Sequence, residues 1–198
     1  MFRYINLFLK RIMDILGSLL GIIILSPLFI IISISIKVDS KGPVFFRQER
    51  LGKNGKVFKI LKFRTMIVNA EKIGDGIMTS ETDYRITKVG RFLRKTSLDE
   101  IPQLINVLIG TMSLVGPRPP VKYHPYKYED YSEEQLKRFI VKPGITGLSQ
   151  VKVRNSVSWD ERIIYDVIYV EENNVFKDVL IIIRTILSIF KNDSIYKE

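Results

Sequence analysis

The sequence predicts an α+β chain that is mainly helical, and three patterns support this fold class. An uncharged apolar run covers residues 15–36. Two strand-like segments, residues 44–48 and 57–64, flank a turn that contains Asn54 and Gly55, a pair favoured in β-hairpins. Two capping boxes later in the chain begin helices. The 198 residues contain no internal repeat, so a single functional unit is predicted.

The apolar run is long enough to cross a bilayer core, which takes about 20 residues. It is too long for the core of a signal peptide, and no small-residue cleavage site follows it. Ser26 and Pro27 lie in its middle, where a proline removes a helical hydrogen bond. Basic residues flank both ends, namely Arg3, Lys10, Arg11, Lys37, Lys41, Arg47 and Arg50. The residues alone leave two readings open, a straight span and a helix-break-helix hairpin that enters and leaves on one face.

The predicted β-hairpin ends in two cations, Lys62 and Arg64. They are either part of a solvated strand face or directed at a ligand. Residues 69–88 are polar, contain glycine and lack periodicity, so a long loop is predicted. Residues 89–94 are predicted to form a short helix.

Three helices are predicted in the second half of the chain. Ser132 with Gln135 begins one over residues 133–140, and Ser158 with Glu161 begins one over residues 159–172. Residues 175–190 have an apolar centre interrupted by Arg184. This segment is either an amphipathic helix at a membrane interface or a helix of the core.

The amino-acid composition indicates an anionic partner and excludes several kinds of catalytic and metal-binding site. With 31 Lys and Arg against 21 Asp and Glu the net charge is +10, which points to a phosphate-bearing substrate, an acidic lipid surface or nucleic acid. The chain has no cysteine, so disulfides, thiolate metal sites and cysteine nucleophiles are excluded. One histidine, His124, argues against histidine-rich zinc sites and a Ser-His-Asp triad. Asp, Glu, Lys, Arg and Tyr remain, with a hard cation bound by oxygen ligands.

The strongest catalytic candidate is the carboxylate pair Asp99 and Glu100, which follows the basic residues Arg91, Arg94 and Lys95. Helix capping is the simpler explanation, with Ser97 or Asp99 as the N-cap. A cap at Asp99 places Pro102 at a tolerated position, but capping accounts for one acid and hardly for both. Alternatively, one carboxylate attacks a phosphorus atom while the other holds a metal ion.

Two turns carry further cations. Arg118 lies between Pro117 and Pro119, which hold it on a stiff extended segment suited to bidentate phosphate binding. A rigid surface turn is the alternative. Lys142 precedes the Pro143-Gly144 turn, a weaker signal of the same kind.

These segments together resemble the bacterial sugar transferase family, the monotopic polyprenyl-phosphate phosphoglycosyl transferases that begin surface-glycan assembly. The resemblance covers nearly the whole chain, in order. It is carried by KRIMD (residues 10–14), SP (26–27), GPVFFRQ (42–48), FKILKFRTM (58–66), GRFLRKTSLDE (90–100), SLVGPRP (113–119) and KPGITG (142–147).

The resemblance implies a two-step transfer of a sugar 1-phosphate from a UDP-sugar to polyprenyl phosphate, with release of UMP. Asp99 would be the nucleophile and Glu100 the Mg²⁺ ligand. The candidate substrate-binding cations are Lys62, Arg64, Arg94, Arg118 and Lys142.

The resemblance also implies a re-entrant membrane hairpin over residues 1–40, broken at Ser26 and Pro27. A cytoplasmic catalytic region over residues 41–198 would be continuous with it, at the cytoplasmic face of the bacterial inner membrane, as a minimal catalytic unit. Membrane lipid is an expected partner and nucleic acid is not, and homo-oligomerisation is left open. Departures from the family pattern at Ile109, Thr111, Leu148 and Ser149 leave the donor sugar undetermined. The rival interpretation is a membrane-anchored basic module that binds anionic lipid or nucleic acid without catalysis.

Overall fold

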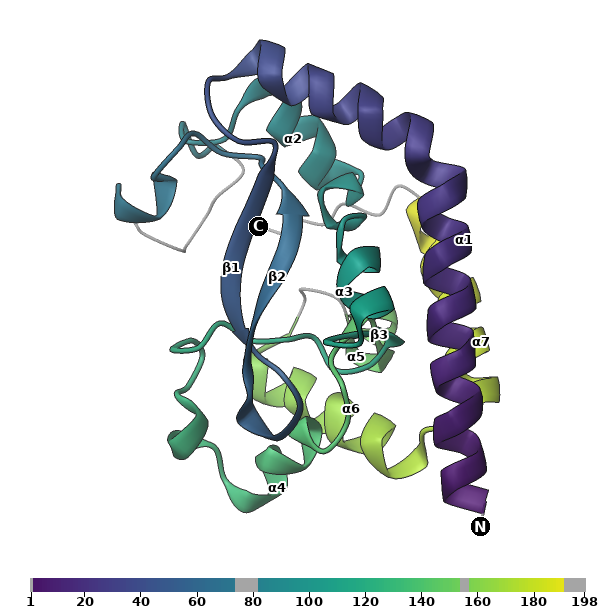
Figure 1. Cartoon of the computed structure of the whole chain (residues 1–198). Helices are drawn as coiled ribbons and strands as arrows, with labels where there is room; N and C mark the ends of the chain where they lie inside the picture. The colour runs from purple at the N-terminus through teal and green to yellow at the C-terminus, as the bar shows by residue number, and fades with distance from the viewer. Residues whose placement is uncertain (1, 74–81, 154–156, 191–198) are drawn as a thin grey trace.

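The predicted apolar segment is one long helix. In the computed structural model, which describes residues 2–73, 82–153 and 157–190, α1 (Phe2–Asp39) contains Pro27 and bends along its length (Figure 1). The Ser26 hydroxyl donates to the carbonyl of Ile23 at 2.8 Å, and Pro27 has no N–H to continue the hydrogen-bond ladder. The predicted break is therefore a bend within a continuous helix.

Most of α1 is exposed. Among the described residues one helix, Tyr4–Asp39, is long and apolar enough to cross a membrane, and only 11% of its most apolar window is buried inside the protein. A core helix of a soluble protein would be mostly buried. Exposed Leu20, Ile24 and Ile30 are suited to contact with lipid, while the re-entrant course stays a prediction.

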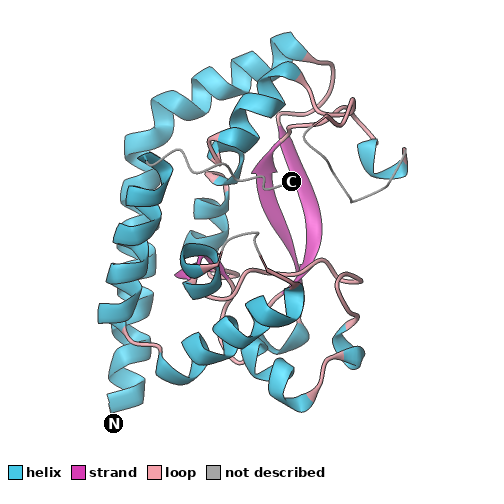
Figure 2. Cartoon of the chain, turned by 180° about the vertical axis from the view of Figure 1, so that it is seen from behind, coloured by secondary structure: helices cyan, strands magenta, loops and turns pink. Residues whose placement is uncertain are grey.

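The hairpin is confirmed. β1 (Phe45–Leu51) pairs antiparallel with β2 (Val57–Phe63), with Phe45 opposite Phe63. Asn54 and Gly55 have φ values of 54° and 72°, which explains why this residue pair occupies the turn. Helices α2 (Lys88–Lys95) and α3 (Gln103–Ile109) lie between the hairpin and α1 (Figure 1 and Figure 2).

In the described part of the second half of the chain, a small parallel sheet is accompanied by four helices. β3 (Ser113–Val115) pairs with β4 (Gly144–Thr146). The helices are α4 (Glu133–Leu136), α5 (Leu148–Lys152), α6 (Trp159–Glu172) and α7 (Val175–Phe190). Both predicted capping boxes are present. The predicted helix over residues 133–140 is shorter than expected, because after α4 the chain tightens into the 3₁₀ turn Lys137–Phe139.

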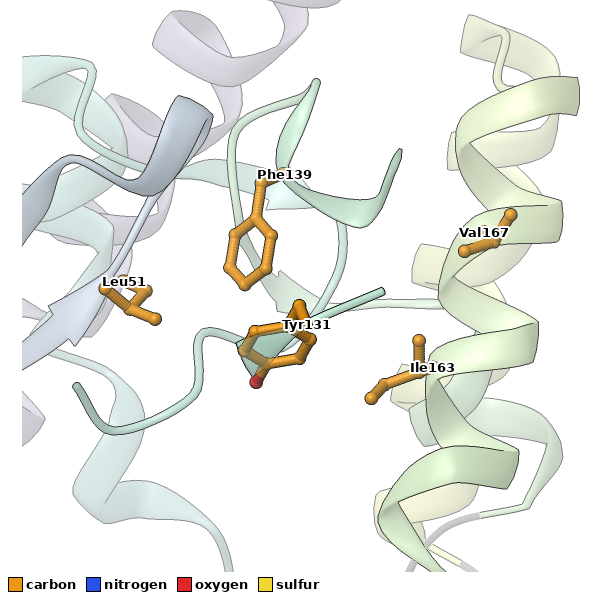
Figure 3. Packing of buried hydrophobic residues seen from close by; sticks show 5 residues of the cluster. All are labelled: Leu51, Tyr131, Phe139, Ile163 and Val167. Carbon is orange, nitrogen blue, oxygen red and sulfur yellow. The ribbon is translucent and has the colours of Figure 1, made fainter. Parts of the chain in front are cut away.

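Two apolar clusters join these parts. One joins the end of β1 to α6 and consists of Leu51, Tyr131, Phe139, Ile163 and Val167 (Figure 3). The other joins the C-terminal part of α1 to β2 and α2 and consists of Ile32, Ile36, Phe63 and Leu93. The long helix is thus packed on the region that carries the carboxylate pair.

A buried polar network ties α1 to α7. Lys10 Nζ donates to Asp178 Oδ2 at 2.6 Å and to the carbonyl of Val115 at 2.9 Å. The Tyr169 hydroxyl lies 2.7 Å from Asp178 Oδ1. One face of α7 is therefore core, whereas residues such as Phe176 are exposed. The interpretation as a core helix is confirmed for the buried face, and contact of the exposed face with a membrane interface stays a prediction.

Candidate active site

The carboxylate pair lies on a single 3₁₀ turn, Leu98–Glu100, between α2 and α3. Ser97 enters this turn with φ 57°, and neither Ser97 nor Pro102, which precedes α3, makes a side-chain cap. Both capping interpretations are therefore wrong, since α3 begins three residues later than capping by Asp99 requires. The turn holds both carboxylates without using either one to satisfy the backbone.

Glu100 is paired with two cations, whereas Asp99 has no hydrogen-bond partner among the described residues. Glu100 Oε1 accepts from Lys62 Nζ at 2.7 Å and from Arg118 Nη2 at 3.0 Å. Lys62 Nζ lies 3.8 Å from Asp99 Oδ2, beyond hydrogen-bond distance. Within the described residues, the Asp99 carboxylate accepts no hydrogen bond although only 9% of the residue is exposed. Both oxygens of Asp99 therefore have lone pairs available to a ligand.

The electrostatics separate the two acids. Burial raises the pKa of Asp99, Lys62 opposes this, and the adjacent Glu100 charge raises it further. Burial alone would also raise the pKa of Glu100, but Arg118 and Lys62 together hold it well below its usual range. Glu100 in turn raises the pKa of Arg118. Asp99 is thus the more basic carboxylate, and when ionised the better nucleophile.

An open cleft of about 1240 Å³ contains the pair, and Lys62, Arg94 and Arg118 line it. The Arg94 Nε donates to the Thr65 hydroxyl at 2.9 Å, which orients the guanidinium. The sequence-predicted phosphate-binding cations Lys62, Arg94 and Arg118 therefore meet around the two carboxylates. Such a cluster can neutralise the oxygens of a bound diphosphate.

Two other candidate cations are placed differently. Arg64 also lines the cleft, but its guanidinium donates to the carbonyls of Ser40 and Lys41 at 2.7 and 2.9 Å. It closes the C-terminal end of α1. Lys142 does not line the cleft and lies near Gly110 and the side chain of Arg11. Neither the guanidinium nor the ammonium group of these two residues is paired with the carboxylates of Asp99 and Glu100 in the described structure.

Sequence reasoning missed two arginines that support the Pro-Arg-Pro segment. Arg138 is buried and donates to the carbonyl of Arg118 at 2.8 Å and to Asp166 Oδ2 at 2.6 Å. Arg50 donates to the carbonyl of Pro119. Burial and the charge of Arg118 lower the pKa of Arg50 to about 10. No local motif marks either residue, since each acts through a backbone carbonyl distant in sequence.

The pair can accommodate a magnesium ion. Among the described residues, no three histidine, cysteine, aspartate or glutamate side chains lie close enough together to hold a metal ion by themselves. Mg²⁺, however, is commonly bound by one or two carboxylates together with substrate phosphates and water. Glu100 Oε2, unlike Oε1, accepts no hydrogen bond from the described residues. The residues present therefore fit a metal ion that completes its shell with phosphate oxygens.

Known proteins resemble this chain over most of its length. The sequence model of the family described as bacterial sugar transferase matches residues 5–192. A UDP-glucose:undecaprenyl-phosphate glucose-1-phosphate transferase of Klebsiella pneumoniae is 43% identical over 97% of this chain and 42% of its own length. The galactosyl transferase CpsE of Streptococcus agalactiae is 42% identical over 93% of this chain and 43% of its own length.

A shorter relative is covered more completely. The exopolysaccharide production protein ExoY of Sinorhizobium fredii is 39% identical over 89% of this chain and 83% of its own length. The chain spans less than half the length of the Klebsiella and Streptococcus relatives. The family match covers both the long helix and the carboxylate cleft, and the chain belongs to the bacterial sugar transferase family.

Proposed function

We propose that this chain transfers a sugar 1-phosphate from a UDP-sugar to polyprenyl phosphate through a covalent intermediate on Asp99. One observation carries the proposal: Asp99 is a largely buried carboxylate without a hydrogen bond in the described structure, in a cleft with Lys62, Arg94 and Arg118. The name of the Klebsiella pneumoniae relative supports the substrate class, because it specifies UDP-glucose, undecaprenyl phosphate and glucose 1-phosphate.

In the first step, an Asp99 carboxylate oxygen attacks the phosphorus that carries the sugar. The bond from this phosphorus to the bridging oxygen breaks, and UMP leaves with the electron pair. In the second step, an ionised oxygen of polyprenyl phosphate attacks the same phosphorus. The bond between Asp99 and phosphorus then breaks, which regenerates the carboxylate and yields a polyprenyl diphosphate sugar.

The remaining residues stabilise charge. Lys62 and Arg118 both bind Glu100 Oε1. These two contacts fix the orientation of the carboxylate and therefore the position of Oε2. Glu100 would hold Mg²⁺, which supplies charge neutralisation at the phosphate oxygens. Arg94 and Arg118 take up the charge of the donor phosphates, since a planar guanidinium binds two phosphate oxygens at once.

The long helix explains how a lipid acceptor reaches the cleft. We place α1 in the bacterial inner membrane, with the cleft at its cytoplasmic face. The C-terminal part of α1 packs on β2 and α2, the elements that carry Lys62 and Arg94. A polyprenyl phosphate embedded beside α1 would therefore present its phosphate close to the carboxylate pair.

The rival reading, a basic module for nucleic acid, loses its main support. It requires the aromatic residues of the hairpin to stack on bases. Phe63 is buried between Phe29 and Phe45, and Phe58 packs on the cluster formed by Ile60, Val107 and Met112. These rings belong to the core.

The test is to supply the membrane-bound protein with Mg²⁺ and a panel of UDP-sugars, with and without polyprenyl phosphate. We expect UMP release, and in the absence of acceptor a mass increase on Asp99 equal to one sugar phosphate. Asp99→Asn should abolish both. Asp130→Asn, an exposed aspartate outside the cleft, is the matched control and should remain active. An active Asp99→Asn protein, or no UMP release with any UDP-sugar, would refute the proposal.

A further inference from the structure

The cleft has a second wall that the reaction steps above do not use. Trp159 and Arg162, from the first turn of α6, line the same cleft as Asp99, together with His124. Trp159 and His124 are the only tryptophan and the only histidine in the chain. Their ring centroids lie 6.0 Å apart in an edge-to-face arrangement, which fixes the orientation of the indole.

Arg162 stacks on this indole and extends the positive charge of the phosphate cluster. Its guanidinium carbon lies 5.4 Å above the Trp159 ring. Nη2 donates to the carbonyl of Val157, whereas the buried Nε has no partner in the described structure. Arg118 and Arg162 line the same cleft, and the charge of Arg118 adds to the effect of burial in lowering the pKa of Arg162. Cations therefore continue from the carboxylate pair, through Arg118, to the indole.

This wall faces away from the point where α6 meets the membrane helix. The C-terminal end of α6 approaches the N-terminal part of α1 (Figure 1 and Figure 2), where Asn6 bonds the backbone of Asn173 and Val175. Trp159 is at the other end of this 14-residue helix, about 20 Å along its axis. The C-terminal part of α1, beside which the acceptor is proposed to arrive, packs on β2 and α2, and α6 contributes no residue to that cluster. The Trp159 end of the cleft is thus left to the water-soluble donor.

We propose that Trp159 and Arg162 form the subsite for the nucleoside monophosphate half of the donor. The indole stacks on the base, and Arg162 with Arg118 binds the phosphate that departs as UMP. An aromatic ring beside a guanidinium is a general platform for a nucleobase with its phosphate. The inference rests on the proposed function, since it takes the donor to be a UDP-sugar.

The single tryptophan provides a direct readout. In the full chain in lipid nanodiscs, UMP should quench Trp159 fluorescence in a saturable manner, in the wild type and equally in Asp99→Asn. Ribose 5-phosphate, which lacks the base, should bind more weakly by on the order of tenfold. Quenching by short-chain polyprenyl phosphate but not by UMP would overturn the proposal, as would the absence of quenching at UMP concentrations that inhibit transfer.

Kinetics provide a second test. Trp159→Leu should raise the KM for the UDP-sugar about tenfold, with kcat and the KM for polyprenyl phosphate unchanged. Arg162→Gln should weaken UMP binding measured by the same fluorescence. Tyr84→Leu, an exposed aromatic residue outside the cleft, should change neither quantity. A rise confined to the acceptor KM in Trp159→Leu would assign this wall to the lipid and overturn the proposal.

The two proposals can fail separately. UMP release without any quenching by UMP would defeat the nucleoside subsite and leave the transferase function intact. Quenching by UMP without release of UMP from any UDP-sugar would defeat the transferase function and retain a nucleotide site.

Discussion

Replacing Lys62 by methionine should shift the pH dependence of the proposed transfer. Lys62 Nζ lies 3.8 Å from Asp99 Oδ2 and 2.7 Å from Glu100 Oε1, and all three side chains are largely buried. Burial raises the pKa of Asp99, and Lys62 is the strongest influence that lowers it. Methionine keeps the length and apolar stem of lysine but removes the charge, so the pKa of Asp99 rises further in the variant.

The size of the effect follows from the distance. Two unit charges 3.8 Å apart attract by about 4 kcal/mol at an effective dielectric constant of about 20. Residual solvent and the nearby Arg94 and Arg118 screen part of this attraction. Its loss therefore raises the pKa of Asp99 further, in the direction that burial already sets.

The sign follows from the role of Asp99. The attacking species is the carboxylate, so the rate is lost as the pH falls through the pKa of Asp99. A higher pKa moves this acidic limb to higher pH. The assay is the initial rate of UMP release over a pH series at saturating donor, compared with the wild type.

Two controls make the result interpretable. Lys62→Arg retains the charge and should leave the acidic limb close to that of the wild type. Lys59→Met removes an exposed lysine of the same strand that does not line the cleft, and should leave the whole profile unchanged. An acidic limb of Lys62→Met that stays in place, or moves to lower pH, would refute the electrostatic reasoning.

Three further substitutions test the packing and the phosphate cluster. Lys10→Met leaves the fully buried Asp178 without its cation, which costs about 3 to 5 kcal/mol and should lower the Tm by about 10 °C in a thermal unfolding measurement. Gly90→Ala places a Cβ atom against the carbonyl oxygen of Thr65, so it should lower the Tm by several degrees although alanine favours helix; an unchanged or higher Tm would contradict this. Arg118→Lys loses the planar fork and should raise the donor KM on the order of tenfold, and an unchanged KM would remove Arg118 from the phosphate site.

Short sequence patterns correctly predicted the structural elements that a few neighbouring residues specify, namely the β-hairpin and two helix starts. The Asn54-Gly55 turn specified the hairpin because both residues accept positive φ. The capping boxes at Ser132 and Ser158 specified helix starts because each is completed within four residues. Helix α4 ended early, since its continuation into a 3₁₀ turn depends on packing of Phe139 into the core.

Short sequence patterns predicted only some of the residues of the candidate active site. Sequence reasoning selected Asp99 and Glu100 by residue type and Arg118 by its flanking prolines. It could not distinguish Lys62, which contacts Glu100, from Arg64, which closes the end of α1. The two residues have like charge and are two positions apart, a spacing that keeps side chains on one face for as long as a strand continues. Strand β2 ends at Phe63, and Arg64, beyond that end, turns to the C-terminal end of α1.

By itself, the sequence determined the apolar helix, the hairpin, the family and the presence of a carboxylate pair among cations, because composition and short-range pattern suffice for these. Only the tertiary structure decided which acid is free. Glu100 is neutralised by Lys62 from a strand and Arg118 from a distant loop, whereas Asp99 is left buried without a hydrogen bond in the described structure. That difference depends on contacts between residues 18 and 38 positions apart in the sequence. The Coulomb energy of such a contact is set by the distance between the charges in space and by their burial. A short stretch of sequence specifies neither quantity.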